Sequence, residues 1–329
     1  MTRSISRHLA WLLVAAAALL AAPAVFAQGA AGYPNKPLRI VVTFTTGGAP
    51  DILARLIGDR LTADWGQPVM VDNKPGAGGN TGADFVAKSA GDGYTLVLGT
   101  VGTHSINGAL YAKMPYDIVK DFAPVTLLAT TPNLLVINND VPAKTLAEFI
   151  ALGKKEGKMT FASAGSGTSI HVSGELFKTM TGIDMTHIPY KGRATAIPDL
   201  LGGRVTMMFD NMPSSLPLVK DGKLRALGVT SAQRSAAAPD IPTIAEQGLP
   251  GFDAVSWFAM FAPAGTPKPI VDKLQVEVKK ILQSPEVGKK LAEIGLEVVG
   301  STPEELAAYQ RAEITKWAKV VKDSGAKVE

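Results

Sequence analysis

The chain has 329 residues, no cysteine and a formal net charge of +4 at pH 7, with 33 Lys and Arg against 29 Asp and Glu. The missing cysteine excludes disulfides, thiolate nucleophiles and cysteine-ligated metal sites. The basic residues are scattered and are not interleaved with aromatic residues, so we expect no nucleic-acid partner. His104, His171 and His187 lie far apart in the sequence, and we expect neither a metal site nor a cofactor.

The first 27 residues are typical of a secretory signal peptide. Arg3 and Arg7 precede an apolar stretch from Leu9 to Ala22, and Val25-Phe26-Ala27 supplies the side chains that signal peptidase needs. The alternative is an uncleaved membrane anchor, but the apolar stretch of about 14 residues is shorter than the ~20 that span a bilayer. We therefore expect cleavage after Ala27 and an exported, periplasmic protein of about 300 residues.

After this segment, short β-branched runs alternate with stretches of helical period. The expected strands, in chain order, are Leu38–Phe44, Val69–Val71, Thr95–Leu98, Met159–Ala162, Met185–Ile188, Val205–Phe209 and Leu224–Val229. The expected helices are Asp51–Asp64, Ile170–Met180, Ala194–Leu201, Pro269–Leu282, Pro285–Ile294 and Pro303–Val321. The alternation predicts an α/β fold in which helices cover mainly parallel sheets.

Two glycine-rich turns follow strands in separate parts of the chain. Thr45-Thr46-Gly47-Gly48 comes after the first expected strand, and the turn from Ser163 to Ser169 comes after the fourth. Each turn would direct free backbone N–H groups and the positive end of a helix at whatever lies beyond its strand. If the two strands belong to separate sheets, the turns can face one another across a cleft that binds an anion.

Other chemistries remain as alternatives. The glycine-rich segment from Lys74 to Gly82 lacks the G-x-G-x-x-G spacing, because the third position falls on Thr81, and it is typical of a tight turn before a helix. Ser166 and His171 could form the nucleophile and base of a secreted hydrolase, although the local string is not the G-x-S-x-G motif. Asp51 either complements the dipole of its helix or fixes a water or ligand N–H in the cleft.

Several motifs resemble the Bug-type receptors of tripartite tricarboxylate transporters, the TctC-like extracytoplasmic solute-binding family. The motifs are the segment Val71–Asn80, Asp92-Gly93-Tyr94-Thr95-Leu96, Ser163–His171, Pro189-Tyr190-Lys191-Gly192, Leu200-Leu201-Gly202-Gly203, Phe209-Asp210-Asn211, Phe261–Pro267 and Gly300–Glu305. They occur in the order and approximate spacing of the family, over essentially all of the mature chain.

The resemblance implies a two-lobe periplasmic-binding-protein fold of the Venus flytrap, type II-like class. Lobe one would hold residues 28–131 and 254–329, and lobe two would hold residues 132–253. It also implies a monomer that is not an enzyme and that delivers its ligand to membrane permease subunits of a tripartite transporter. A role as an accessory protein that reports the ligand to a sensor kinase stays open.

Family members bind small organic carboxylates, often dicarboxylates, acidic amino acids or aromatic acids. By the resemblance, the two turns grip one carboxylate and further residues meet the other end of the ligand. The ligand-binding residues expected by position are Phe44, Gly47, Gly48, Asp51, Thr100, His104, Ser166, Gly167, Thr168, Ser169, His171, Tyr190, Lys191, Gly192, Arg193 and Asp210.

Arg193 departs from the family pattern, which usually has small residues and a proline after Tyr190-Lys191-Gly192. A guanidinium at the edge of the cleft could take a second carboxylate through two hydrogen bonds. Alternatively, the side chain is solvated on the first turn of a helix. The sequence leaves both roles open.

Overall fold

The computed structural model describes residues 32–328, and the chain from Pro34 onwards forms one compact unit. The expected signal peptide and its cleavage after Ala27 lie outside the described residues. Every helix of the described range is too short or too polar to cross a membrane.

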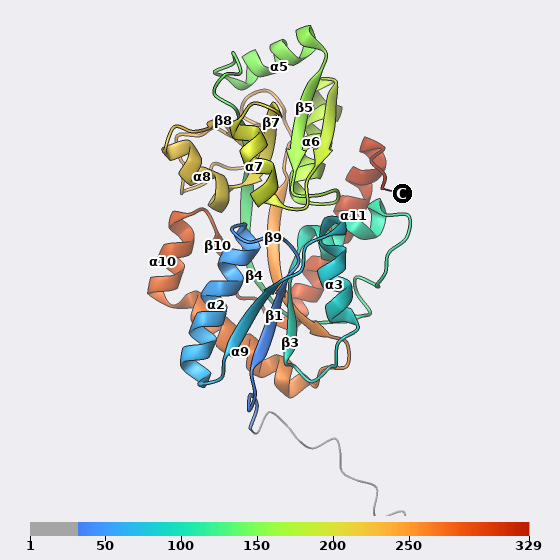
Figure 1. The fold of residues 1–329 in the computed structure, drawn as a ribbon, viewed down its shortest axis with the longest axis vertical. Helices are drawn as coiled ribbons and strands as arrows, with labels where there is room; N and C mark the ends of the chain where they lie inside the picture. Colours follow the sequence, from blue (N-terminus) through green and yellow to red (C-terminus); the bar gives the residue numbers. More distant parts are fainter. Residues whose placement is uncertain (1–31, 329) are drawn as a thin grey trace, which may run out of the picture. The chain divides into compact units, whose positions relative to one another are not determined.

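The first group of elements is a three-stranded parallel sheet with its helices (Figure 1). Strand β1 (Leu38–Val42) lies between β2 (Val69–Asn73) and β3 (Thr95–Thr100). The sequence LRIVV is almost completely buried in β1, as expected for a central parallel strand covered on both faces. Helix α2 (Ala49–Trp65) follows β1, and a 3₁₀ turn η1 (Ala77–Gly79) and helix α3 (Asn80–Ala87) follow β2.

Two long strands that the sequence analysis missed connect this group to the next. Strand β4 (Phe122–Ile137) pairs with β9 (Val255–Pro263) over residues 122–132 and with β7 and β8 over residues 133–137, always antiparallel. Both strands run through the middle of Figure 1. They are buried on both faces and contain prolines, so neither the alternating pattern nor an uninterrupted β-branched run marks them in the sequence.

The second group contains the parallel strands β5 (Met159–Ser163), β6 (Met185–Pro189) and β7 (Met207–Asn211), together with β8 (Arg225–Val229) beside β4. Its helices are α5 (Leu146–Glu156), α6 (Ser169–Thr181), α7 (Arg193–Leu201) and α8 (Met212–Lys220). In the described residues the strand order is β2-β1-β3-β9-β4-β7-β5-β6. The sheet is therefore parallel towards both ends and antiparallel around β4 and β9.

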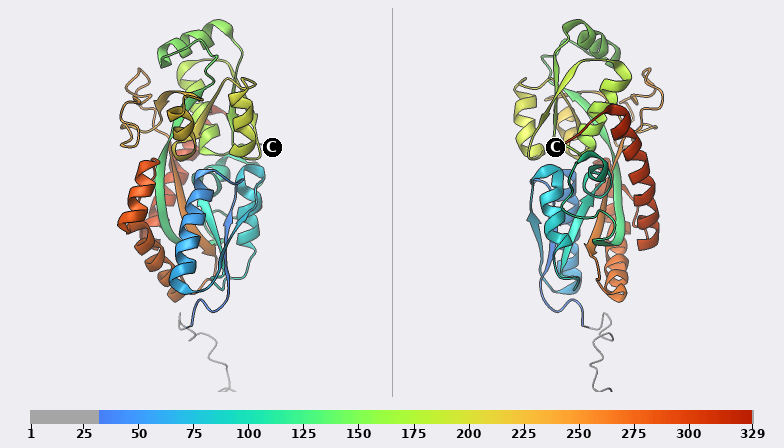
Figure 2. Two further views of the ribbon diagram at one scale, coloured as in Figure 1. Left: turned by 60° about the vertical axis from the view of Figure 1, so that its left-hand side comes forward. Right: turned by 90° about the vertical axis from the view of Figure 1, so that its right-hand side faces the viewer.

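The C-terminal helices return to the long strands. Helices α9 (Lys268–Gln283), α10 (Pro285–Glu293) and α11 (Pro303–Ser324) flank the short strand β10 (Glu297–Val298), and Figure 2 shows α9 and α11 in orange and red along β4 and β9. Helix α11 begins with a reciprocal capping box formed by Thr302 and Glu305.

Between β3 and β4, a π-helical turn η2 (Gly102–Ile106) runs into helix α4 (Asn107–Leu110). The two groups of elements touch where this segment and the glycine-rich turn after β2 meet the turn after β5. Tyr111 Oη donates a hydrogen bond to the carbonyl oxygen of Ser166, 3.0 Å away. Gly78 lies so close to the same carbonyl that a side chain at Gly78 would collide with it. The tight packing expected of this glycine-rich turn is confirmed, and it brings the two groups into contact.

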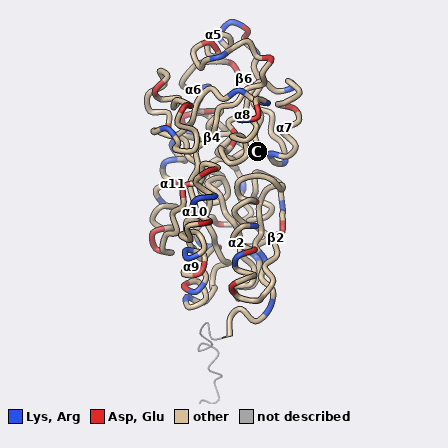
Figure 3. Tube along the Cα trace, turned by 90° about the vertical axis from the view of Figure 1, so that its left-hand side faces the viewer, with Lys and Arg blue, Asp and Glu red and all other residues tan. Residues whose placement is uncertain are grey.

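Charged residues are spread over the unit. In the view of Figure 3, Lys and Arg alternate with Asp and Glu along the trace. This distribution agrees with the small net charge of the sequence.

Candidate functional site

A pocket lies where strands β1, β3, β5 and β7 end, which is the position at which open α/β sheets bind ligands. It encloses about 500 Å³ of empty space, part of which is open to solvent. Its lining comes from both groups of elements and from β9: Phe44, Thr45, Gly48, Pro50, Thr100, Val101, Ala164, Thr168, Ser169, Ile170, Arg193, Asp210, Asn211, Ser214, Ser256 and Phe258.

The turn between β1 and α2 contributes Phe44, Thr45 and Gly48 to the pocket. Gly48 caps α2 with extended backbone angles and with no side-chain hydrogen bond to the first turn. Pro50 contributes no N–H, but the other N–H groups of the first turn of α2 keep their capacity to bind an anion, and the helix dipole adds a favourable potential.

Asp51 holds this turn together from behind and is not part of the pocket lining. One carboxylate oxygen accepts hydrogen bonds from the Gly47 N–H and from Arg55 Nε, and the other contacts Arg55 Nη2 and Asn73 Nδ2, at 3.0 to 3.1 Å. Burial would raise the pKa of Asp51, but the hydrogen bonds from Arg55, Gly47 and Asn73 outweigh it and hold the pKa below its usual value. Of the two roles open to Asp51, the geometry favours a structural one.

The turn between β5 and α6 supplies the opposite wall. Thr168 is the N-cap of α6, where its Oγ1 accepts from the N–H of His171 and donates to the carbonyl oxygen of Gly165. Ser169 accepts a hydrogen bond from Ser256 Oγ on β9 at 2.6 Å. This contact fixes the first residue of α6 against a long strand that serves both groups of elements.

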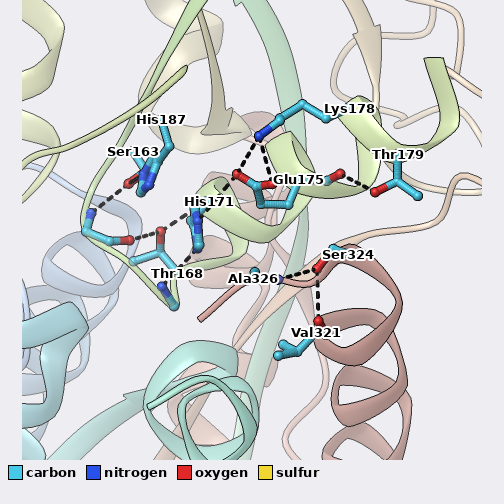
Figure 4. A network of polar contacts seen from close by, with 12 residues as sticks. Ser163, Thr168, His171, Glu175, Lys178, Thr179, His187, Val321, Ser324 and Ala326 are labelled. Atoms are coloured by element: carbon cyan, nitrogen blue, oxygen red, sulfur yellow. Dashed lines mark hydrogen bonds and ion pairs between the residues drawn. The ribbon is translucent and has the colours of Figure 1, made fainter. Parts of the chain in front are cut away.

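A stack of aromatic rings lies next to that turn, and Figure 4 shows its two histidines, His171 near Thr168 and His187 near Ser163. The rings of His171 and His187 are 4.0 Å apart, and His187 also stacks on Phe161. The N–H of Gly167 donates to His171 Nδ1, and Ser163 Oγ lies 2.6 Å from His187 Nε2. Burial lowers the pKa of His171 to about 4 and that of His187 to about 3, with smaller effects of nearby positive charge, so both rings are neutral at pH 7.

The hydrolase alternative required Ser166 and His171 to act together. In the described part of the chain, no hydrogen bond joins their side chains: His171 Nδ1 accepts from the Gly167 N–H, and His171 Nε2 lies 3.8 Å from Glu175 Oε1. The serine that does approach a histidine is Ser163, which is fully buried. This geometry does not favour the hydrolase.

Arg193 and Asp210 meet on the far side of the pocket. Arg193 Nε donates to Asp210 Oδ2 at 2.7 Å, and Arg193 Nη2 donates to the carbonyl oxygen of Ser214 at 2.7 Å. The Arg193 side chain is 17% exposed, so the alternative of a solvated surface side chain does not hold. Burial raises the pKa of Asp210, although the charge and hydrogen bond of Arg193 and the Asn211 N–H act against the shift.

Other expected site residues lie elsewhere. Ser166, Tyr190 and Lys191 line a second, separate pocket near the glycine-rich turn after β2. Tyr190 Oη donates to Asp199 at 2.6 Å, and burial together with this bond raises the pKa of Tyr190 to about 12. Gly47, Gly167 and Gly192 are likewise absent from the lining of the first pocket and belong to the turns that frame it.

His104 is fully buried behind β3 and stacks on Phe261 with ring centroids 4.1 Å apart. Burial lowers its pKa to about 3. Its ring contacts Phe261 on β9 and Phe122 on β4, and His104 lies outside the lining of the pocket.

Several residues that line the pocket were not predicted from the sequence, including Asn211, Ser214, Ser256 and Phe258. Asn211 and Ser214 follow Asp210 closely, so the Phe209-Asp210-Asn211 motif could have indicated them. Ser256 and Phe258 lie on β9, which gave no signal because the strand itself was missed. Among the described residues, no cluster of three or more potential ligands could hold a metal ion.

Comparisons with known proteins agree with this geometry. The family model described as the tripartite tricarboxylate transporter family receptor matches residues 53–326. An R. palustris protein solved with adipate is 42% identical, with a TM-score of 0.88, over 90% of this chain and 100% of that chain. The periplasmic binding protein BugD is 34% identical, with a TM-score of 0.87, over 90% and 100%. MatC from Rhodopseudomonas palustris, solved with bound malate, is 36% identical, with a TM-score of 0.84, over 88% and 100%.

Proposed function

Since the chain belongs to the receptor family of tripartite tricarboxylate transporters, we propose that it captures a small organic carboxylate in the pocket described above and delivers it to the permease subunits of such a transporter. In this role it is a monomeric carrier and not an enzyme. The export signal is cleaved after Ala27, which releases the mature protein into the periplasm.

The observation that carries this proposal is the composition of the pocket. It joins the N-termini of α2 and α6 to buried side-chain oxygens of Asp210, Ser214 and Thr45 that have no hydrogen-bond partner within the described residues. Buried polar atoms are normally paired, so the unpaired ones indicate a polar molecule that completes them. The relatives solved with adipate and malate support a carboxylate as that molecule.

Backbone N–H groups suit a carrier because it must also release its ligand. Contacts with helix termini stabilise an anion by ~0.3 to 2 kcal/mol each, without a salt bridge to a dedicated cation. The ligand contacts both groups of elements, so it favours the closed arrangement that a membrane partner can recognise. The division into lobes at residues 131 and 254 stays a prediction.

The sensor alternative shares the same pocket and differs only in the membrane partner. Crosslinking or pull-down with permease subunits would support transport, whereas stable association with a sensor kinase would support sensing.

Ligand-induced thermal stabilisation tests the proposal. The mature protein is unfolded and refolded to remove bound ligand, then heated with a panel of mono-, di- and tricarboxylates, aromatic acids and acidic amino acids. A ligand present at 100 times its Kd stabilises the native state by about 2.7 kcal/mol. We expect a rise in Tm with at least one carboxylate and none with neutral sugars.

A substitution at Gly48 tests the position of the site. The backbone angles of Gly48 suit any residue, and a Cβ there would meet only Pro50 Cδ at 3.6 Å. Gly48→Leu should therefore fold and fill the pocket, which abolishes the ligand-induced rise in Tm. Gly288→Leu, on helix α10 and outside the pocket lining, is the matched control and should keep the rise. Undiminished stabilisation of Gly48→Leu would contradict this placement of the site.

A further inference from the structure

The pocket contains three of the eight buried side-chain atoms that have no hydrogen-bond partner within the described residues: Asp210 Oδ1, Ser214 Oγ and Thr45 Oγ1. An unpaired buried polar atom is unfavourable, because it has given up its bonds to water without replacing them. Because these three atoms belong to side chains that line the same pocket, a single polar ligand can complete all of them.

Two of the three atoms lie beside the ion pair at the far side of the pocket. Asp210 is fully buried at the end of β7, and only its Oδ2 is bonded to Arg193. Ser214, on α8, holds Arg193 Nη2 with its carbonyl oxygen, while its own hydroxyl is unpaired. Among the described residues, Arg193 Nη1 donates no hydrogen bond, so a donor, an acceptor and a hydroxyl are all unpaired at one end of the pocket.

The charges at this end determine which chemical group fits. Arg193 and Asp210 are the charged residues of the pocket lining, and they neutralise each other. A second ligand carboxylate would accept from Arg193, but it would also face the unpaired oxygen of Asp210. An ammonium group would donate to Asp210, but it would lie beside the Arg193 guanidinium.

A neutral hydroxyl avoids both conflicts. It donates one hydrogen bond to Asp210 Oδ1 and accepts from Arg193 Nη1 or from Ser214 Oγ, without adding a charge to a buried site. The charges and the unpaired atoms therefore select the same group.

We propose that Arg193, Asp210 and Ser214 recognise a hydroxyl at the end of the ligand opposite to the carboxylate, so that the preferred ligands are ω-hydroxy acids. The inference rests on the proposed function, because it assumes that the turns at α2 and α6 hold the ligand carboxylate.

Isothermal titration with matched ligands tests the end group. 4-Hydroxybutyrate, succinate and 4-aminobutyrate have four carbons each and differ only at the distal carbon. The corresponding hydroxy acid, dicarboxylate and amino acid are compared at five carbons, where the dicarboxylate is glutarate, and at six, where it is adipate. We expect the hydroxy member of at least one set to bind about tenfold tighter than its two partners. A dicarboxylate or amino acid that binds tighter at every length would overturn the proposal.

Asp210→Asn gives a second, sharper readout. It removes the negative charge but keeps the size of the side chain, so Arg193 becomes an uncompensated cation facing the ligand. We expect the preference to move about tenfold or more towards the dicarboxylate of the same length. An unchanged preference would contradict the proposal, because it would mean that Asp210 carries no charge that the ligand meets.

Ser214→Ala tests the same end without changing a charge. We expect several-fold weaker binding of the hydroxy acid and little change for the dicarboxylate. Ser105→Ala is the matched control, because the Ser105 hydroxyl is also buried and unpaired but lies outside the pocket lining. Equal effects of the two substitutions would contradict recognition at Ser214.

The two proposals fail in different ways. Carboxylate binding that Gly48→Leu abolishes, but that shows no preference for a hydroxyl, would overturn the end-group inference and keep the carrier function. Failure of every carboxylate to bind the stripped wild-type protein would overturn both.

Discussion

Asp51 and Asp210 are both buried aspartates next to the same pocket, yet their environments differ. Asp51 lies behind the turn from β1 to α2, and both of its carboxylate oxygens are fully used by Gly47, Arg55 and Asn73. Asp210 lies at the end of β7, and one of its oxygens has no partner within the described residues.

The pKa directions follow this difference. For Asp51, burial acts to raise the pKa, but the hydrogen bonds together outweigh burial, so the pKa is lowered. For Asp210, burial outweighs the ion pair and hydrogen bonds, so the pKa is raised. The comparison separates a carboxylate that shapes the site from one that is available to a ligand. Burial alone does not make this distinction, but the number of partners does.

The largest expected effect is at Asp51. Asp51→Asn removes the charge and turns an amide group towards donors that a carboxylate had satisfied. We expect a loss of about 2 to 3 kcal/mol in the free energy of unfolding, measured with urea, and weaker binding of every carboxylate irrespective of its distal group. If this variant kept normal stability but changed its ligand preference, the result would indicate that Asp51, and not Asp210, contacts the ligand.

The turn before α6 is held by the neutral ring of His171. Protonation of this ring should therefore lower the stability of the fold at a higher pH than protonation of Asp51 does. The pKa of His171 falls from 6.5 to about 4 in the folded protein, so the unfolded chain binds more protons between these values. Stability contributed by the neutral ring is therefore lost as pH falls below 6.5, by up to about 3 kcal/mol.

Thermal unfolding between pH 7 and pH 4 measures this loss. His171→Gln keeps a neutral polar side chain that does not titrate, and the slope of Tm against pH should become smaller in this variant. The contribution of Asp51 is lost only below about pH 4, because the pKa of this carboxyl in the folded protein lies below its ordinary value of 3.8. An unchanged slope would contradict the buried, neutral state of His171.

A smaller effect of opposite sign is expected at Asp210 in the empty protein. A raised pKa means that the ionised carboxylate destabilises the fold, increasingly so as pH rises above 3.8 through the folded pKa. Asp210→Asn should therefore raise Tm at pH 7, and the difference from wild type should shrink towards pH 4. A lower Tm at pH 7 would show that the pairing of Arg193 outweighs the burial of Asp210.

The smallest expected changes in the free energy of unfolding concern two hydroxyls, that of Thr168, which is paired, and that of Ser214, which is not. Thr168→Ala removes the N-cap of α6 and should cost about 1 kcal/mol. Ser214→Ala removes a hydroxyl without a partner and should leave the stability of the empty protein nearly unchanged. Equal losses in urea denaturation would mean that the Ser214 hydroxyl is paired in solution.

The family and many of the local elements follow from the amino-acid sequence alone. Local sequence signals predicted β1, β3 and β5, the C-terminal helices that begin with proline, and the glycine turns. These signals suffice because the backbone geometry of each segment depends mainly on neighbouring residues. The ordered motifs indicated the family that the comparisons confirm. The turns at Gly48 and Thr168 could be placed at the pocket because strand ends and helix starts are local features.

Tertiary packing is needed to establish which residues share the pocket and which keep an unpaired polar atom there. Strands β4 and β9 are recognisable only from their pairing with distant strands, so Ser256 and Phe258 were missed. The family resemblance placed His104, Asp51 and Asp210 together among the expected ligand-binding residues. The stacking of His104 on Phe261, the hydrogen bond of Asp51 with Asn73 and the pairing of Asp210 with Arg193 depend on residues that are distant in the sequence. Gly47 and Arg55 also bind Asp51, but they lie only four positions from it. Partner counts in a buried site are a property of the packed chain, and no local pattern encodes them.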